Sequence, residues 1–123
     1  MTRHRPVHLY STPEACKTAS VTSRQALYWV SEGLLIPSNR AEGSGHWHAW
    51  SVSDVAFLRV LGVVSRIGTG VMLRHVAQEL RNRPLPWSAI TFDLDEHSSL
   101  TIHVPLIVAD LTEAYFDEKA AYA

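Results

Sequence analysis

Two helix-start signals lie ten residues apart, and they constrain the fold more than any other feature of this sequence. At the first, Thr12 precedes Pro13 and Glu14, an order that predicts a helix with Thr12 as its N-cap. At the second, Thr22 and Gln25 have the spacing of a capping box. The first helix must therefore end within two or three residues of the second. Two short helices joined by so tight a turn predict a helix-turn-helix.

The second helix is predicted to have one apolar face. Ala26, Trp29 and Val30 recur at i, i+3 and i+4, which is the spacing of a buried helical stripe. Gly33 is expected to end this helix, because glycine adopts the left-handed conformation that follows many helices. The chain is then expected to enter the core through three apolar residues: Leu34, Leu35 and Ile36.

Residues 37–50 mix turn formers with aromatic and histidine residues. Gly43-Ser44-Gly45 predicts a small hairpin whose return strand runs from His46 to Trp50, and a hairpin that follows a helix-turn-helix is typical of a wing. Of its aromatic residues, Trp50 is expected in the core. Two amphipathic helices are predicted next, one beginning at Ser51 and the other ending before Pro84. A break at 68–70 separates them.

The last third of the chain differs from the rest. Residues 90–94 and 100–104 alternate apolar and polar side chains, which predicts two strands of a hairpin. A helix is predicted from Leu106 to Tyr122. The fold class is therefore α+β and mainly helical: a basic arm (1–8), a winged helix-turn-helix domain (9–83) and an acidic hairpin with a final helix (84–123).

Charge is divided between the two ends of the chain. Residues 1–83 hold ten Lys and Arg against five Asp and Glu, a net +5, whereas residues 84–123 hold one Lys against seven acids, a net −6. A basic front indicates a polyanionic partner, and an acidic tail is not expected to contact one.

Composition excludes several other classes of protein. With 46% apolar and 19% charged residues the sequence is typical of a folded domain, and one cysteine excludes a disulfide framework. That residue, Cys16, is expected in the core. The basic first six residues are followed by no apolar run, so no signal peptide is predicted, and no apolar stretch is long enough to span a membrane. A cytoplasmic protein is expected.

Residues 21–38 resemble the helix-turn-helix of the MerR family, and most of all its actinobacterial branch, which carries an Arg-Gln-x-x-Tyr-Trp element like that from Arg24 to Trp29. The resemblance continues in order through the wing and the next two helices. It is carried there by Gly43-Ser44-Gly45, Trp50-Ser51, Asp54, Gly70-Val71 and Leu73. It covers about residues 9–83 and implies a winged helix-turn-helix that binds double-stranded DNA.

The sequence departs from the family at several positions. Ala26 and Leu27 stand where the family usually has Leu and then Arg or Asp. His48 replaces the usual wing arginine, and Met72 stands where Ser is common. No heptad pattern follows Pro84, so the long dimerising helix of the family is not predicted. The resemblance implies DNA binding and leaves the family's DNA-distorting activation mechanism open.

The second helix and the wing supply the candidate DNA contacts: Ser23, Arg24, Gln25, Leu27, Tyr28, Arg40, His46, Trp47 and His48. Arg24 can reach a guanine edge and Leu27 a thymine methyl group. Tyr28 can reach a phosphate, although it can equally pack on the wing, and the cap can occupy Gln25. His48 is a weaker cation than arginine, so binding is expected to tighten below neutral pH.

Other residues of the sequence suggest further phosphate contacts and a metal site. Lys17, Arg3 and Arg5 could add phosphate contacts. His46 and His48 alternate along a strand and could chelate a metal, but only His75, His97 and His103 remain as further candidates and no cysteine pair lies nearby. No metal or other cofactor is therefore expected. No catalytic motif is present, and the protein is not expected to be an enzyme.

The tail is expected to form a dimer contact, because an isolated two-stranded hairpin is marginally stable in water. The candidate dimerisation residues are Phe92, Leu94, Leu100, Ile102, Val104, Leu111 and Tyr115. Removal of the chain after Pro84 is then expected to leave a folded monomer.

The predicted function is sequence-specific binding of double-stranded DNA by a homodimer that regulates transcription. One alternative is an excisionase-like accessory factor of a phage or plasmid. Another is a protein-interaction module, an anti-regulator that has lost DNA binding and holds its partner with the acidic tail. A recombinase or RNA polymerase is a possible further partner, and no membrane partner is expected.

Overall fold

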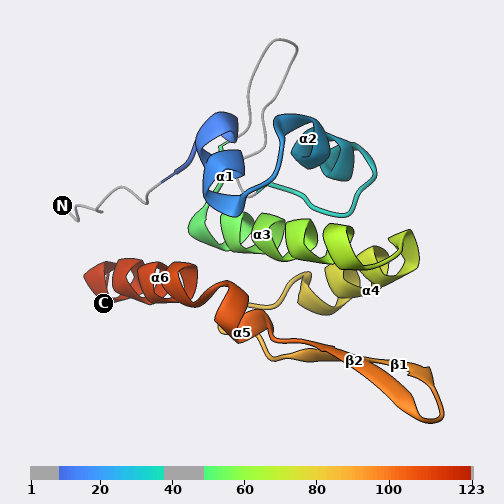
Figure 1. Ribbon diagram of the computed structural model, residues 1–123. Coiled ribbons are helices and arrows are strands. Elements are labelled where there is room, and N and C mark those ends of the chain that lie inside the picture. Colours follow the sequence, from blue (N-terminus) through green and yellow to red (C-terminus); the bar gives the residue numbers. More distant parts are fainter. Residues whose placement is uncertain (1–8, 38–48, 123) are drawn as a thin grey trace.

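The computed structural model describes residues 9–37 and 49–122 (Figure 1). In these residues the secondary structure runs in the order α1 (Thr12–Ala19), α2 (Ser23–Ser31), α3 (Val52–Ile67), α4 (Gly70–Leu80), β1 (Ile90–Asp95), β2 (Ser98–Ile102), α5 (Val104–Ile107) and α6 (Ala109–Tyr122). The fold is α+β and mainly helical, as the sequence predicted. The only strands in named elements of this part of the chain form the β1–β2 hairpin.

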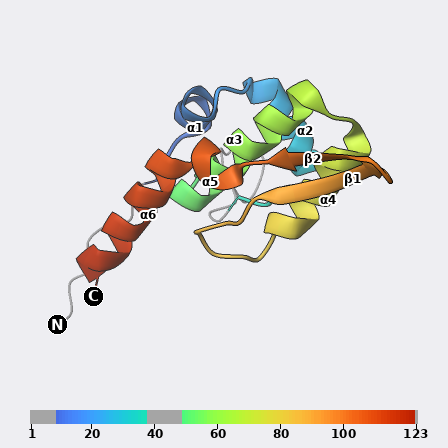
Figure 2. The ribbon, with the colours of Figure 1, turned by 60° about the horizontal axis from the view of Figure 1, so that its bottom comes forward.

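Helix α3 lies in the middle of the molecule. Figure 1 shows α1 and α2 on one side of it and α5, α6 and the hairpin on the other, with α4 beside its C-terminal end. Figure 2 gives the same arrangement from below, with α6 and the hairpin extending to opposite ends. Helices α1 and α2 of the basic front and the acidic tail therefore lie on opposite sides of α3.

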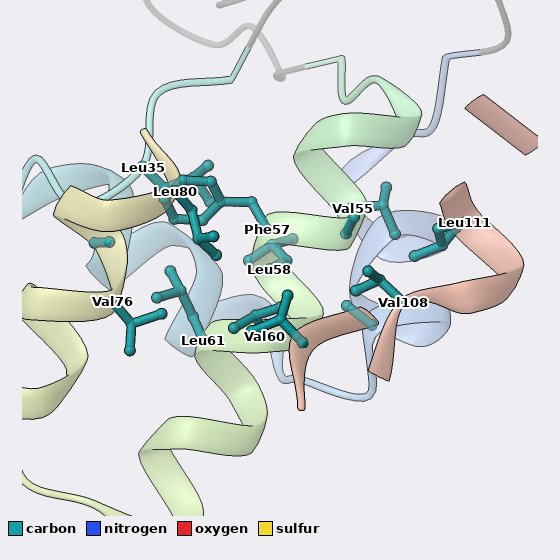
Figure 3. Close-up of a cluster of buried hydrophobic side chains, with 14 of the residues drawn as sticks. Leu35, Val55, Phe57, Leu58, Val60, Leu61, Val76, Leu80, Val108 and Leu111 are labelled. Atoms are coloured by element: carbon teal, nitrogen blue, oxygen red, sulfur yellow. The ribbon is translucent and has the colours of Figure 1, made fainter. Parts of the chain in front are cut away.

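The core is built on α3, ten of whose residues are buried. Such a helix must be covered on more than one side, because it is apolar around most of its circumference. Figure 3 shows side chains from the front, from α3 and α4, and from the tail in one cluster: Leu35, Val55, Phe57, Leu58, Val60, Leu61, Val76, Leu80, Val108 and Leu111. The helix-turn-helix and the tail thus share one hydrophobic core.

The segment between α4 and β1 belongs to this core as well. Leu85 and Trp87 are buried. The Trp87 ring lies edge-on to Phe57 with 6.1 Å between centroids, and its indole nitrogen donates to the Arg83 carbonyl at 3.0 Å. The chain after Pro84 is consequently packed against α3 rather than joined to it by an open linker.

The first helix begins one residue earlier than predicted. Ser11, not Thr12, is its N-cap: the Ser11 hydroxyl accepts from the Glu14 N–H at 3.3 Å, and the Glu14 carboxylate accepts from the Ser11 N–H at 3.0 Å. A capping box needs an acidic or amide side chain three residues after the cap, and Ala15 cannot fill that place for Thr12. The predicted capping box of α2, between Thr22 and Gln25, is confirmed.

The end of α2 follows the prediction closely. Gly33 has a φ of +76°. Its N–H donates to the Val30 carbonyl and the Leu34 N–H donates to the Trp29 carbonyl, which together make a Schellman motif. Of the three residues expected to enter the core, Leu35 is buried and Leu34 is half-buried. The prediction is wrong for Ile36, which is 60% exposed.

The hairpin has a tighter turn than predicted. Ile90 pairs with Ile102 and Phe92 with Leu100, so the expected faces match. Only residues 96–97 lie between the strands, and the Asp95 carboxylate accepts from the His97 N–H at 2.7 Å. Val104 is not in the second strand, because Pro105 suits the first turn of a helix and α5 begins there.

The predicted final helix is divided in two at Val108. Val108 and Leu111 are buried, and Ala114 and Tyr115 are half-buried, which confirms the predicted apolar face. Among residues 9–37 and 49–122, no helix has the length and apolar character needed to cross a membrane.

Candidate nucleic-acid interface

The two faces of α2 differ sharply in exposure. Ala26 and Trp29 face the core, with 0% and 3% of their surfaces exposed. On the other side Arg24 is exposed, Leu27 is 45% exposed and Tyr28 is 58% exposed. The predicted inward and outward residues of this helix are confirmed. A leucine and a tyrosine exposed side by side, next to an arginine, make a surface suited to contact with another molecule.

The turn before α2 is held tightly against α3. A Cβ atom at Gly62 would lie 2.5 Å from Cγ1 of Val21, so only glycine allows the turn to approach so closely. Arg66, from the last turn of α3, donates to the Ser20 carbonyl at 3.4 Å. Cys16 lies below the turn with 4% of its surface exposed, and burial raises the pKa of its thiol. Its predicted place in the core is confirmed.

The other end of α2 is held by α4. The Arg81 guanidinium donates to the carbonyls of Gly33 and Leu34, the latter at 3.0 Å. These carbonyls follow the helix C-terminus, where the macrodipole favours a cation. Sequence reasoning did not single out Arg81, because its partners lie 48 and 47 residues earlier in the chain. Contacts at both ends therefore fix the direction of α2.

Two polar side chains of α2 are used by the helix itself. The side-chain oxygen of Gln25 accepts from the Thr22 N–H at 3.0 Å, so the cap occupies the oxygen of this predicted DNA contact. The Ser31 hydroxyl donates to the Tyr28 carbonyl at 2.7 Å. Ser23 is exposed in the first turn. The side chains best placed for an external partner are therefore Arg24, Leu27 and Tyr28.

A shallow hollow of about 120 Å³ lies beside Tyr28. It is lined by residues of α2, the segment after it, and α4: Tyr28, Glu32, Leu34, Gly70, Leu73 and Arg74. Arg74 is exposed, and sequence reasoning missed it as a candidate. The signal available was a basic residue in the second turn of the predicted helix after Gly70, but only the fold brings that turn next to α2.

Most described acids of the front are used within the structure, whereas some of its cations are not. Glu14 and Asp54 form capping boxes, and Glu79 lies 3.7 Å from His75 and 3.8 Å from Arg83. Among residues 9–37 and 49–122, no ion pair forms on three exposed cations: Lys17, Arg24 and Arg74. The surface around α2 thus retains positive charge, whereas the acidic tail lies across α3 (Figure 1).

The predicted wing contacts lie outside the described residues: Arg40, His46, Trp47 and His48, together with Arg3 and Arg5 of the arm. At the edge of this segment Trp50 is fully buried, as predicted, and its indole nitrogen donates to the Thr12 hydroxyl at 2.9 Å. The part of the chain that the structure describes contains no group of three residues able to hold a metal ion.

The seven candidate dimerisation residues fall into two groups. Ile102, Val104 and Leu111 are buried by the chain's own core, with at most 3% of each exposed. The expectation that these three are free to pair with a second copy is therefore wrong, because they belong to the same hydrophobic core as α3. The other four retain exposed surface: Leu94 is 60% exposed, and Phe92, Leu100 and Tyr115 are half-buried.

Part of the chain is similar to known proteins. No family model matches the chain. A stretch of 68 residues, 54% of the chain, is 37% identical to proteins named uncharacterized HTH-type transcriptional regulators in Mycobacterium tuberculosis and Mycobacterium bovis. The match spans 29% of the length of those relatives.

Proposed function

We propose that this protein binds double-stranded DNA through α2 and regulates transcription. The observation that carries the proposal is the outer face of α2, which exposes Arg24, Leu27 and Tyr28 while its inner face is held in the core. A helix-turn-helix inserts the N-terminal part of its second helix into the major groove, and this is the part of α2 that carries Arg24 and Leu27.

Each exposed residue has a role that its chemistry suits. The Arg24 guanidinium can donate two hydrogen bonds to a guanine edge, and the Leu27 side chain can pack on a thymine methyl group. Tyr28 and Arg74 border one hollow, which Glu32 also lines, and the hydroxyl and the guanidinium can each reach a backbone phosphate at its rim. The function is binding, and we assign no catalytic residue.

Two further observations support the proposal. The relatives that match 54% of the chain are named HTH-type transcriptional regulators. The negative charge of the tail lies across α3 from α2, so it does not oppose the approach of DNA to the outer face of α2. The finer proposal is a MerR-like winged helix-turn-helix that binds as a homodimer to two half-sites. Four residues of the predicted wing would then supply further DNA contacts: Arg40, His46, Trp47 and His48.

The test begins with selection of bound duplexes from a random pool. Arg24→Ala should then weaken binding to the selected site by ~1–3 kcal/mol and relax the preference at one base pair. Lys119→Ala is the control, because Lys119 is an exposed cation of α6 in the opposite layer. The proposal is wrong if the pool yields no preferred sequence, or if both variants bind as the wild type does.

A further inference from the structure

The two outer edges of the hairpin are chemically different. Within residues 9–37 and 49–122, β1 and β2 form a two-stranded sheet, so each strand has one edge that no other described strand pairs. The β1 edge carries Asp93 and Asp95, and the register shifts between these two residues. The β2 edge, Ser98 to Ile102, has no charged residue, no proline and no irregularity of that kind.

This difference indicates which edge is open to another strand. Proteins protect exposed edges with charges and bulges, because an unprotected edge pairs with any strand that fits it. The β1 edge has both protections and the β2 edge has neither. The β2 edge is also accessible, since Ser98, Ser99 and Thr101 are exposed.

We propose that β2 pairs with β2 of a second copy of this chain, antiparallel about a two-fold axis, to make a four-stranded sheet. This inference rests on the proposed function, because it says how the DNA-binding dimer forms. A second copy suits this edge, because the uncharged β2 strand can pair with itself. Pairing of β1 with β1 would bring Asp93 and Asp95 of both copies together, whereas β2 pairing with β2 brings no charges together.

The side chains of β2 suit such a pairing. In a register centred on Leu100, the leucines of the two copies face each other, and Ser99 of each copy lies opposite Thr101 of the other. The hairpin already contains a contact of this kind, because the hydroxyls of Thr91 and Thr101 lie 2.9 Å apart across the strands. The Leu100 pair would also cover apolar surface that the chain itself leaves half-exposed.

The place of the hairpin in the fold is compatible with DNA binding by both copies. The hairpin extends past α4 in both views (Figures 1 and 2). Figure 1 shows α3 between the hairpin and α2. A sheet formed there leaves the outer face of α2 uncovered. A five-residue edge is a small interface, so we expect concentration-dependent association that DNA strengthens by holding two copies together.

Thr91 and Thr101 provide a matched pair of substitutions. They are direct partners on one face of the hairpin, so replacing either one removes the same hydroxyl contact. Sedimentation of the full chain without DNA, over a micromolar to submillimolar series, should show a dimer for the wild type and for Thr91→Lys. Thr101→Lys should be monomeric, because the two lysines would lie diagonally across the interface, within reach of each other's charge. Thermal unfolding checks that both variants fold.

Mixing variants separates a lost interface from a damaged fold. Thr101→Lys and Thr101→Glu should each be monomeric alone, and together they should form a mixed dimer. The proposal is overturned if the wild type is monomeric throughout the series, if Thr101→Lys still forms dimers, or if Thr91→Lys loses them equally. It is also overturned if the mixture stays monomeric.

A DNA experiment distinguishes this inference from the proposed function. On DNA with two selected sites, Thr101→Lys should reduce cooperativity by about tenfold, a typical coupling between sites, while binding to a single site is unchanged. Thr91→Lys should retain both properties. If no variant binds DNA, the proposed function fails but the dimer result stands. If single-site binding is normal in all and cooperativity persists in Thr101→Lys, the β2 interface is wrong.

Discussion

Helices α2 and α6 lie on opposite sides of α3, and they differ in which of their apolar side chains are buried and which are exposed. Helix α6 turns Leu111 into the core and leaves acids such as Asp117 exposed, and its exposed Phe116 lies edge-on to Tyr115 with 5.3 Å between ring centroids. Helix α2 buries Trp29 but exposes Leu27 and Tyr28.

This difference in exposure distinguishes the side chains that stabilise the fold from those that are available to a partner. The apolar face of α6 is accounted for by packing on α3. The outer face of α2 is not needed to cover the core, since Ala26 and Trp29 already do so. Large apolar side chains kept in water beside unpaired cations are better explained by an external partner than by folding.

The sharpest test of the tail is its removal. A chain that ends at Pro84 loses core residues that are each worth about 1.5–3 kcal/mol when buried. Together these residues contribute as much as a typical total stability of about 5–15 kcal/mol. The core residues lost are Leu85, Trp87, Ile90, Ile102, Val104, Val108 and Leu111. We now expect this truncation to unfold, in contrast to the folded monomer predicted from the sequence. A cooperative thermal transition in circular dichroism would contradict that expectation.

Substitution of two neighbouring aromatic residues of α2 should affect different properties, one the stability and the other DNA binding. Trp29→Ala should lower the free energy of unfolding by ~3–5 kcal/mol, because a large buried side chain leaves a cavity. Tyr28→Ala should change it by about 0.5 kcal/mol or less, since Tyr28 is largely exposed, yet weaken DNA binding. Urea unfolding and gel shifts measure the two effects. If Tyr28→Ala is as destabilising as Trp29→Ala, the outer face of α2 serves folding.

One arginine of α3 connects the two layers. Arg59 donates to the Thr18 carbonyl at 2.9 Å, to the Ile107 carbonyl at 3.1 Å and to both carboxylate oxygens of Asp110. Arg59→Met keeps much of the apolar stem and should cost about 2–3 kcal/mol, because hydrogen bonds to a charged group are lost. Arg74→Met is the control and should leave the urea midpoint unchanged, since Arg74 is exposed.

The smallest effect concerns pH. The hydrogen bonds from Arg59 hold the pKa of Asp110 below its usual value. A carboxyl with a lowered folded pKa stabilises the fold above its unfolded pKa of about 4, and that contribution is lost as pH falls through the folded pKa. Asp110→Asn should therefore reduce stability slightly at pH 7 and flatten its decline in acid. A pH series of thermal midpoints measures this, and parallel curves would contradict it.

Local features of the fold could be predicted from the sequence because each depends on residues a few positions apart. The Thr22–Gln25 cap, the Gly33 stop and the two faces of α2 are of this kind. The candidate site followed from them, since Arg24, Leu27 and Tyr28 are outward by helical periodicity alone. The Ser11 cap was missed by one residue because Thr12 is also a good cap, and only the partner at Glu14 distinguishes them.

Other features were decided by the tertiary structure, because their partners are far apart in the sequence. Arg81 reaches the end of α2 across 48 residues, and Arg59 reaches Asp110 across 51. Whether Ile102 and Leu111 face a second copy or the chain's own core depends on the side of α3 on which the tail lies. Periodicity shows that a face is apolar, but it does not identify the surface that covers it. Only long-range packing makes that choice.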